Sequence, residues 1–408
     1  MSLVGACRSC AARGLEPILD LGALPLANAL LTREQLEAPE ARYPLELVFC
    51  PACALVQITE TVPPERLFGE YLYFSSFSDS FVEHARLLAE RLVQERGLGP
   101  HSLVVELASN DGYLLQHYLA RGVPVLGVEP ARNVAAVAEA RGIPTRVAFF
   151  GRELAEQLVA AGRRADLLHA HNVLAHVADL NGFVRGLATL LAPNGLAVIE
   201  VPYVRELVER LEFDTIYHEH LCYFGLGALV PLFERHGLRL TGAERVVVHG
   251  GSLRVFAAHA GAGHAPAVAA LLAEEQSAGL ARIAFYRSFA ARVAALRARL
   301  RATLVDLRGR GARLAVYGAA AKASVLLNCL ELPPGTLEFV VDRSPHKQGR
   351  FLPGLRLPIR PVEALLDEQP DYALLTAWNL KDEVLAQQAK YRHRGGRFIL
   401  PLPEVEIL

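Results

Sequence analysis

Two Cys-x-x-Cys pairs near the start of the chain constrain its fold more than any other feature. The pairs are Cys7-Arg-Ser-Cys10 and Cys50-Pro-Ala-Cys53. Each pair brings two thiolates close enough to share one tetrahedral ion, and two pairs supply four sulfur ligands with no open position, which is the pattern of a structural zinc site. Four unrelated buried thiols are the alternative, and a redox pair is disfavoured because neither pair follows a strand at the start of a helix. We therefore predict a zinc-binding domain over residues 1–65.

Length and composition set the broad class of protein. The 408-residue chain is 52% hydrophobic and 21% charged, which is enough for roughly two or three packed domains. Its formal net charge of -1 gives no support for nucleic-acid or membrane-surface binding. The sequence shows no signal-peptide pattern and no apolar run of about 18 residues. We expect a cytoplasmic monomer in which the six cysteines are thiols or metal ligands rather than disulfides.

Residues 100–265 alternate between strand and helix patterns. The apolar run 102–107 is interpreted as a buried parallel strand, followed by a small polar turn and an amphipathic helix. Further strands are predicted at 123–128, 165–170, 196–201, 238–247 and 253–258. Strands separated by helices favour a doubly wound parallel sheet, in which ligands bind beyond the carboxyl ends of the strands. We predict an α/β protein whose central domain, residues 66–265, is Rossmann-like.

The last part of the chain repeats this alternation on a smaller scale. Residues 266–310 are an Ala/Leu/Arg-rich helical connector, with a break predicted near Gly279. Residues 311–408 contain strand patterns at 314–318, 338–341, 372–377 and 397–400. We therefore predict a smaller C-terminal Rossmann-like α/β domain.

The turn after the first central strand is suited to S-adenosylmethionine (SAM). Small residues in this turn let a ligand approach the backbone, and the helix start favours a polar group. Glu129 ends the next strand about 20 residues further on, where an acid accepts hydrogen bonds from ribose hydroxyls. A clean G-x-G-x-x-G fingerprint is missing, which favours SAM over a dinucleotide, and an ordinary turn with a helix cap is the alternative. The candidate cofactor residues are Glu106, Ala108, Asn110, Asp111, Gly112, Glu129 and Asn172.

The stretch 212–224 has more polar groups than a core element needs. It holds two histidines, three carboxylates and two tyrosines, with no helix or strand period. A metal site is one interpretation, but its histidines are spaced differently from those of a helical H-E-x-x-H motif. General acid–base chemistry is the more natural one, because a histidine of near-neutral pKa can remove a proton beside a carbonyl. His176 follows the strand predicted at 166–170, and this position places it near the same ligand.

Two other segments could border a ligand. The run Tyr71-Leu-Tyr73-Phe-Ser-Ser-Phe-Ser is either a hydrophobic plug or a pocket wall. Gly318-Ala-Ala-Ala-Lys322 follows a C-terminal strand and could seat a diphosphate, with Asn379 as a further contact. A nicotinamide dinucleotide site is disfavoured by the degenerate glycine pattern, and a packing-driven turn is the alternative.

Taken in order along the chain, these motifs resemble one family. They are the two Cys-x-x-Cys pairs, called the cysteine knuckles below, the run from Tyr71, Glu106-Leu-Ala-Ser-Asn-Asp-Gly112, Gly127-Val-Glu-Pro130, Asn172-Val-Leu-Ala-His176, Glu200-Val-Pro-Tyr203, Tyr217-His-Glu-His220, His249-Gly-Gly-Ser-Leu-Arg254 and Gly318-Ala-Ala-Ala-Lys322. Together they resemble the sugar C-methyltransferases that act at C-3 of nucleotide-linked 4-keto-deoxysugars, over essentially the whole chain. The resemblance implies an N-terminal zinc domain, a central SAM domain and a C-terminal Rossmann-like domain, with the nucleotide-sugar in the cleft between them.

The resemblance also implies roles for individual residues. The family's active-site residues match His220 as the base, with Tyr217, Glu219, His176 and one of Tyr71 and Tyr73 around it. The substrate-binding candidates are Tyr203, His218, Lys322 and Asn379. One departure is Ala108, where many methyltransferases carry glycine.

We therefore predict a SAM-dependent C-methyltransferase with structural zinc. Its expected substrate is a nucleoside-diphosphate 4-keto-deoxysugar, most simply a thymidine-linked one. In the family's reaction a base takes the C-3 proton, acidified by the C-4 ketone, and the enolate carbon receives the methyl group with inversion. Two alternatives remain open, which are O- or N-methylation of a nucleotide sugar on the same scaffold, and a zinc-bearing binding module without catalysis.

Overall fold

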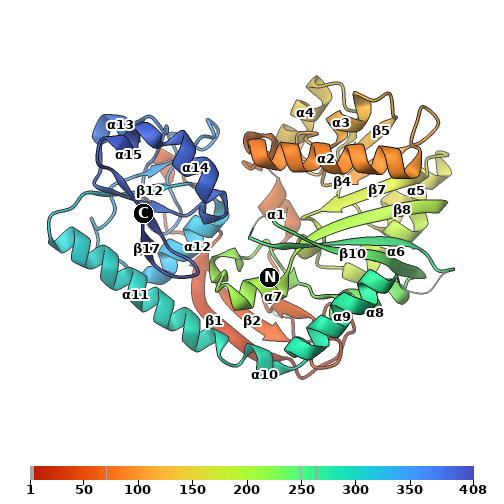
Figure 1. Cartoon of the computed structure of the whole chain (residues 1–408), viewed down its shortest axis with the longest axis horizontal. Coiled ribbons are helices and arrows are strands. Elements are labelled where there is room, and N and C mark those ends of the chain that lie inside the picture. The colour runs from red at the N-terminus through yellow and green to blue at the C-terminus, as the bar shows by residue number, and fades with distance from the viewer. Residues whose placement is uncertain (1–3, 70, 249, 262–264) are drawn as a thin grey trace.

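Three β-sheets organise the described part of the chain, which comprises residues 4–69, 71–248, 250–261 and 265–408 of a computed structural model (Figure 1). The first sheet is antiparallel and has the strand order β1-β2-β3-β9. Its strands are β1 (Glu16–Pro25), β2 (Arg42–Phe49), β3 (Val56–Ile58) and β9 (Cys222–Tyr223). The first cysteine knuckle precedes β1 and the second connects β2 to β3. Both knuckles therefore lie at the same end of this sheet, where Glu16, Phe49 and Val56 pair.

Strand β9 ties the N-terminal sheet to the middle of the chain. Gln57 of β3 pairs with Cys222, and the backbone N–H of Ile58 donates to the carbonyl oxygen of Leu221 at 3.0 Å. The N–H of Leu221 in turn donates to the carbonyl oxygen of Ala175 at 2.7 Å. The stretch 212–224, called the polar stretch below, is therefore held between two sheets rather than forming an open loop.

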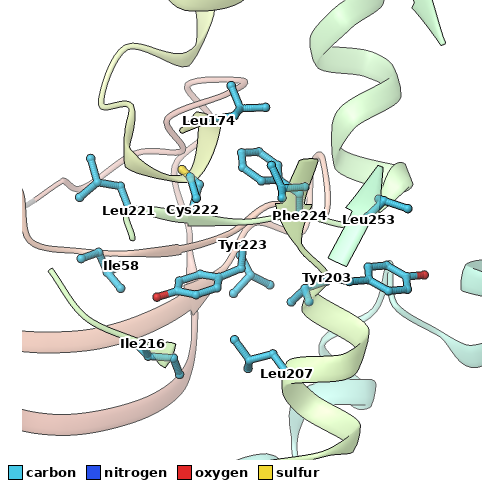
Figure 2. Close-up of a cluster of buried hydrophobic side chains, with 14 of the residues drawn as sticks. Ile58, Leu174, Tyr203, Leu207, Ile216, Leu221, Cys222, Tyr223, Phe224 and Leu253 are labelled. Atoms are coloured by element: carbon cyan, nitrogen blue, oxygen red, sulfur yellow. The ribbon is translucent and has the colours of Figure 1, made fainter. Parts of the chain in front are cut away.

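Apolar side chains from several segments pack together at this junction. Figure 2 shows them, with Ile58 of the N-terminal sheet close to residues that follow the central strands, among them Leu174, Leu207, Leu221 and Phe224. The stretch 212–224 contains only a 3₁₀ turn at Phe213–Thr215 and the two-residue β9 as regular structure. Its lack of periodicity in the sequence is explained by this short, irregular path.

The second sheet is the largest and has the order β10-β11-β8-β7-β4-β5-β6. Its strands are β4 (Val104–Leu107), β5 (Val125–Val128), β6 (Thr145–Arg146), β7 (Ala165–His171), β8 (Leu191–Pro202), β10 (Leu238–Val246) and β11 (Ser252–His259). Neighbouring strands from β8 to β6 are parallel, which confirms the predicted α/β class. Strand β11 departs from the predicted parallel arrangement, because it runs antiparallel to both β8 and β10. The connection from β10 to β11 is too short for the crossover that parallel neighbours require. His249, in that connection, lies outside the described residues.

Helices cover both faces of the central sheet. Val104 shares a core cluster with side chains of α2 and α3, whereas Val105, which points to the opposite face, packs with α5 and α6. The helices of this part are α1 (Pro64–Phe68), α2 (Asp79–Arg96), α3 (Leu115–Leu119), α4 (Arg132–Ala140), α5 (Arg152–Ala160), α6 (Leu180–Leu190), α7 (Val204–Glu209) and α8 (Leu226–Glu234). The parallel strands β4, β5 and β7 end at the same edge of the sheet, which positions the turns that follow them side by side.

The remainder of the chain forms the helical connector and the third sheet. The connector comprises α9 (Pro266–Ala278), α10 (Ile283–Tyr286) and α11 (Phe289–Gly309), and the predicted break falls at Gly279 with φ of 85°. The third sheet, of order β14-β13-β12-β15-β16-β17, is parallel except at β17. Its strands are β12 (Leu314–Tyr317), β13 (Val340–Val341), β14 (Ile359–Arg360), β15 (Tyr372–Leu375), β16 (Arg397–Leu400) and β17 (Glu406–Ile407). Its helices are α12 (Ala321–Leu330), α13 (Ala364–Glu368), α14 (Lys381–Gln387) and α15 (Ala389–His393). None of the helices in the described ranges is long and apolar enough to cross a membrane.

A buried carboxylate docks the connector onto the central part. Glu275 of α9 accepts hydrogen bonds from the Tyr203 hydroxyl at 2.9 Å and from the backbone N–H groups of Leu226 and Gly227 at 2.8 and 2.9 Å. These two N–H groups belong to the first turn of α8, where no carbonyl within the helix can accept from them. Glu275 therefore caps α8 and fixes Tyr203 at the same time.

Replacing Glu275 with glutamine should destabilise the folded protein. An amide nitrogen in place of one carboxylate oxygen would face a donor and leave it buried without a partner, which costs about 1–3 kcal/mol. Urea unfolding followed by circular dichroism measures the loss. Glu274→Gln is the matched control, because the Glu274 side chain is 57% exposed and its surface ion pairs contribute less than about 1 kcal/mol. Equal unfolding free energies for the two variants would contradict the capping role.

Candidate active site

A cavity of about 640 Å³ lies where the three sheets meet. Its wall includes Asn28 from the N-terminal part and the aromatic segment 71–78. The polar stretch contributes Tyr217 and His220, and the C-terminal part contributes residues from 317 to 322. This volume falls within the range of roughly 300–1,000 Å³ that small-molecule sites occupy, so the cavity is the natural candidate for the active site.

The four knuckle cysteines converge at the edge of the first sheet. Their sulfur atoms all lie within 4.8 Å of one another, with Cys7 at 3.5 Å from Cys53 and Cys10 at 3.6 Å from Cys50. Tetrahedral zinc with Zn–S bonds of about 2.3 Å needs sulfur atoms roughly 3.8 Å apart, so the cysteines fit zinc. Within the described ranges, no other group of three or more potential ligands lies close enough to share an ion, which argues against the metal interpretation of 217–220.

The turn after β4 borders the cavity in left-handed backbone conformations. The angle φ is 53° at Ala108, 51° at Asn110 and 79° at Gly112. A Cβ atom on Gly112 would lie 2.2 Å from Cδ1 of Ile143, so only glycine fits there. Left-handed alanine is strained by about 1–2 kcal/mol, which explains why glycine is common in methyltransferases where this chain has Ala108.

Two side chains order this turn and the segment above it. Glu129 accepts the N–H of Asn110 at 2.9 Å and a second backbone N–H at 2.8 Å, and its burial raises its pKa to about 7. The Asn110 side chain accepts the N–H of Ser75 at 2.8 Å and donates to the carbonyl oxygen of Tyr73 at 3.1 Å. The segment 71–78 is therefore fixed across the turn, and it forms a wall of the cavity rather than a plug.

The predicted cofactor residues divide into wall and support. Those on the cavity wall are Ala108, Asn110, Glu129 and Asn172. Those behind it are Glu106, Asp111 and Gly112. Burial raises the pKa of Glu106, and its Oε2 atom has no hydrogen-bond partner. Asp111 instead holds the Ser76 hydroxyl and the Arg141 guanidinium, the latter at 3.3 Å. Glu129, a carboxylate on the cavity wall at the end of β5, fits the ribose hydroxyls of SAM.

Tyr217 and His220 form a hydrogen-bonded pair on the cavity wall. His220 Nδ1 lies 3.0 Å from the carbonyl oxygen of Thr215, and because a carbonyl only accepts, Nδ1 carries the proton. His220 Nε2 lies 2.9 Å from the Tyr217 hydroxyl. Burial raises the pKa of Tyr217 well above its usual value, so this hydroxyl stays neutral. The pair therefore places His220 Nε2 and a neutral hydroxyl side by side at the cavity.

A second histidine lies edge-on to this pair. The ring centroids of His176 and His220 are 4.7 Å apart, at an interplanar angle of 86°. Burial lowers the pKa of His176 to about 4, and its Nδ1 atom is buried without a partner. Phe68 packs against His176 and also against Tyr71, each with ring centroids 5.6 Å apart. Tyr71 is thus closer to the histidines than Tyr73, which lies over the cofactor turn.

Glu219 lies next to the wall and is held by a residue from the N-terminal part. The side-chain nitrogen of Asn28 is 2.8 Å from one carboxylate oxygen and 3.0 Å from the other. Burial raises the pKa of Glu219 to about 7, while hydrogen bonds from Asn28 and Tyr71 and the charge of Lys347 oppose the rise. Glu219 therefore changes charge near neutral pH.

His218 and Tyr203, both predicted to bind substrate, are directed elsewhere. His218 Nε2 lies 3.2 Å from the carbonyl oxygen of Tyr43 and 3.1 Å from that of Pro44, so this ring anchors the polar stretch to β2 and does not line the cavity. Tyr203 borders the cavity, but its hydroxyl donates to Glu275. His218 therefore does not lie where a substrate-binding residue was predicted. The hydroxyl of Tyr203 is already occupied by Glu275 and so is not directed at a substrate.

Lys322 and Asn379 lie together on the C-terminal wall. The Lys322 ammonium donates to Asn379 Oδ1 and lies 4.2 Å from the centroid of the Trp378 ring. Burial lowers the pKa of Lys322 to about 8. The indole N–H of Trp378 donates to Asp214 Oδ2 at 2.8 Å, which joins this wall to the polar stretch. Burial also raises the pKa of Asp214 to about 6 and that of Glu212 to about 8.

Three residues of the site escaped the sequence analysis, namely Asn28, Lys347 and Trp378. Asn28 and Lys347 lie in no motif and at no predicted strand end. Trp378 is the one tryptophan of the chain, and this is the single signal that could have drawn attention to it. Lys347 Nζ donates to the carbonyl oxygen of Ala319 at 3.0 Å and lies 3.7 Å from Asp342. Asp342, which follows β13, also accepts the N–H of Ala319 at 2.7 Å and so supports the turn after β12.

Models of known families match three successive parts of the chain. A zinc binding domain matches residues 7–68, a methyltransferase domain matches residues 81–242, and a C-methyltransferase C-terminal domain matches residues 247–403. With the cysteine cluster and the cavity at the strand ends, these matches define the protein class as a SAM-dependent methyltransferase that carries a zinc-binding domain.

Individual relatives narrow this class. The C-methyltransferase NovU of Streptomyces niveus is 40% identical over 407 residues, which cover 99% of this chain and 97% of NovU. A ubiquinone biosynthesis O-methyltransferase of Methylobacterium sp. (strain 4-46) is 36% identical over 107 residues, covering 24% of this chain and 42% of that protein. The structure of magnesium protoporphyrin IX methyltransferase from Synechocystis PCC 6803 with bound SAM has a TM-score of 0.34 and 14% identity, over 48% of this chain and 89% of that one. The chain belongs to the C-methyltransferase family that includes NovU.

Replacing Cys50 with alanine should release zinc and destabilise the N-terminal sheet. Metal binding to four thiolates contributes directly to folding, so the loss of one ligand lowers the melting temperature. Metal analysis of the purified protein should find equimolar zinc in the parent and little in the variant. Cys329→Ala, which removes a buried thiol from α12, should retain the zinc. A Cys50→Ala protein with unchanged zinc content and melting temperature would refute the structural role.

Replacing Ala108 with glycine should stabilise the protein. The substitution relieves about 1–2 kcal/mol of left-handed strain and costs roughly 0.5–1 kcal/mol of additional chain entropy, so a gain of about 0.5–1 kcal/mol is expected. Ala136→Gly, at an exposed site in α4, should instead lose about 1 kcal/mol. Thermal unfolding of both variants measures the difference in sign, and a loss of stability in Ala108→Gly would show that its φ is not strained.

Proposed function

We propose that this protein methylates C-3 of a nucleoside-diphosphate 4-keto-deoxysugar. The observation that carries the proposal is the Tyr217–His220 pair with His176 beside it, on the wall of a cavity that also borders the SAM turn. An imidazole can remove a proton from a carbon next to a ketone. O- or N-methylation begins at a hydroxyl or an amine and needs no carbon acid. Membership of the C-methyltransferase family and the family-like motifs support the same conclusion.

In the proposed reaction His220 Nε2 accepts the C-3 proton. The electron pair of the C–H bond moves into the carbonyl, which becomes an enolate. Once substrate displaces it from Nε2, the Tyr217 hydroxyl donates to the enolate oxygen, with Tyr71 and the neutral His176 as further hydrogen-bonding groups. Bound SAM supplies the electrophilic methyl group that replaces the proton at C-3. The proton on His220 passes to solvent when the product leaves.

We assign the two ligands to opposite ends of the cavity. The wall residues Ala108, Asn110, Glu129 and Asn172 would hold SAM, with Glu106, Asp111 and Gly112 shaping the turn behind them. Lys322 and Asn379 would contact the diphosphate, because a partly buried ammonium and an amide are suited to phosphate oxygens. The thymidine linkage of the substrate rests on the family resemblance alone.

The same proposal covers the organisation of the chain. We assign residues 1–65 to a zinc-binding domain, 66–265 to the methyltransferase domain, 266–310 to a connector and 311–408 to a C-terminal Rossmann-like domain. We also propose that the protein acts as a monomer.

Replacing His220 with asparagine should abolish exchange of the C-3 proton with solvent deuterium. Loss of a general base typically lowers the rate by about 10²–10⁴-fold. Proton NMR of the ketosugar in D₂O, without SAM, measures the exchange apart from methyl transfer. His236→Asn is the control, because His236 lies outside the cavity and its Nε2 contacts Asn181 rather than the polar stretch. Exchange at the parent rate in His220→Asn would show that His220 is not the base.

The position of the new methyl group tests the reaction class. Carbon NMR of the product should show a methyl group bonded to C-3. A methoxy or N-methyl signal would instead establish O- or N-methylation. Absence of transfer to any nucleoside-diphosphate ketosugar, with function that survives His220→Asn, would establish a binding module.

A further inference from the structure

Asn28 links the zinc-bearing sheet to the chemistry of the cavity. Among the described residues that precede Pro64, it is the one that lines the cavity. Its amide nitrogen donates to both carboxylate oxygens of Glu219, at 2.8 and 3.0 Å, across 191 residues of sequence. A carboxylate offers only acceptors, so the direction of donation is fixed as long as Glu219 is ionised.

The backbone around Asn28 is held on both sides. β1 ends at Pro25, and Leu26 and Leu30 are buried on either side of Asn28. Leu31 exchanges two backbone hydrogen bonds with Phe351 of the C-terminal part, both at 2.9 Å. The segment is thus packed between the zinc-bearing sheet and the C-terminal part, which limits the positions that the Asn28 side chain can take.

The groups around Glu219 come from every part of the molecule. Asn28 belongs to the N-terminal part and Tyr71 to the aromatic segment 71–78. Tyr217 belongs to the polar stretch and Lys347 to the C-terminal part. Burial and then the charge of Glu219 raise the pKa of both Tyr71 and Tyr217. Burial raises the pKa of Glu219 itself, and of the three groups that oppose this effect Asn28 has the largest influence. Without Asn28, the carboxyl would lose the main donor that favours its charged form.

We propose that Asn28 is a positioning residue, which orients the Glu219 carboxylate and keeps it ionised at the pH at which the enzyme works. This inference rests on the proposed function, in which Tyr71, the hydrogen-bond donor to Glu219, is one of the groups near the enolate. An ionised Glu219 accepts the hydrogen bond of Tyr71 and so directs that hydroxyl. Protonation of Glu219 would turn one of its oxygens into a donor, so its hydrogen bonds with Asn28 and Tyr71 would have to rearrange. The zinc-bearing sheet therefore contributes a side chain to the active site as well as a scaffold.

Asn28→Asp and Asn28→Ala test this role through the pH dependence of kcat/KM. In Asn28→Ala the pKa of Glu219 rises, so the acid limb of the profile should move to higher pH by about one unit. On the acid side only, kcat/KM should therefore fall by about a further tenfold. Asn28→Asp is isosteric and should fold, but it places two carboxyl groups together that must share a proton, so its shift should be larger. A residue with only a structural role would lower the whole profile without moving the limb.

Infrared difference spectra give a readout that does not require turnover. The carbonyl band that disappears in Glu219→Gln identifies the protonated Glu219 carboxyl. In the parent this band should appear only near or below neutral pH, and in Asn28→Ala it should persist to higher pH. Asn181→Ala is the matched control, because Asn181 donates to the Ser9 carbonyl oxygen of the first knuckle at 2.9 Å but does not line the cavity. It should shift neither the band nor the limb.

The outcomes separate this inference from the proposed function. If Asn28→Ala and Asn28→Asp leave both the limb and the infrared band at the parent position, Asn28 does not control Glu219 and the inference is overturned. If the band shifts but the parent protein transfers no methyl group to a ketosugar, the effect of Asn28 on Glu219 stands and the proposed function fails.

Discussion

The pairing of β3 with β9 is the interaction on which the rest of this structure depends. β3 follows the second cysteine knuckle, so a zinc ion on the four cysteines would fix its position. β9 belongs to the same short segment as His220, and both residues of β9 are buried. An irregular segment with many polar groups is costly to bury unless its backbone finds partners, and β3 supplies them on one side while Ala175 supplies one on the other. The zinc-bearing sheet thereby holds the polar stretch at the carboxyl edge of the central sheet.

One physical effect, desolvation, sets the protonation of the cavity. It raises the pKa of Glu219 to about 7 and that of Glu129 to about 7, and it lowers the pKa of His176 to about 4. In each case burial favours the neutral form. The neutral form of His176 avoids the cost of an isolated buried charge, and hydrogen bonds to Glu129 and Glu219 reduce this cost for the two carboxylates. Tyr217 fits this setting, because burial raises its pKa and keeps its hydroxyl neutral.

The sequence predicted the features that have a local signature and missed those that depend on distant contacts. The knuckles, the turn after β4 and the break at Gly279 in the connector each follow from spacing or residue type within a short window. The direction of β11 required knowledge of how a hairpin joins the sheet. The contact between Asn28 and Glu219 has no local signature, because a single amide reaches a carboxylate across most of the chain. His218 shows the same limit, since neighbouring residues of an irregular segment point in different directions and only the packed structure decides which one faces the cavity.

The C-terminal wall shows how burial can prepare a site for an anion. Lys322 has a pKa near 8, and Glu212, also on the cavity wall, has a pKa of about 8. An anion placed between them stabilises the charged form of Lys322 and disfavours ionisation of Glu212, so both pKa values move upward. The two shifts act in the same direction, which means that anion binding is accompanied by proton uptake and becomes tighter as the pH falls through this range. A surface ion pair between fully charged partners would not respond in this way, because neither group would titrate near neutral pH. The proposed diphosphate would therefore be bound with proton uptake at this wall.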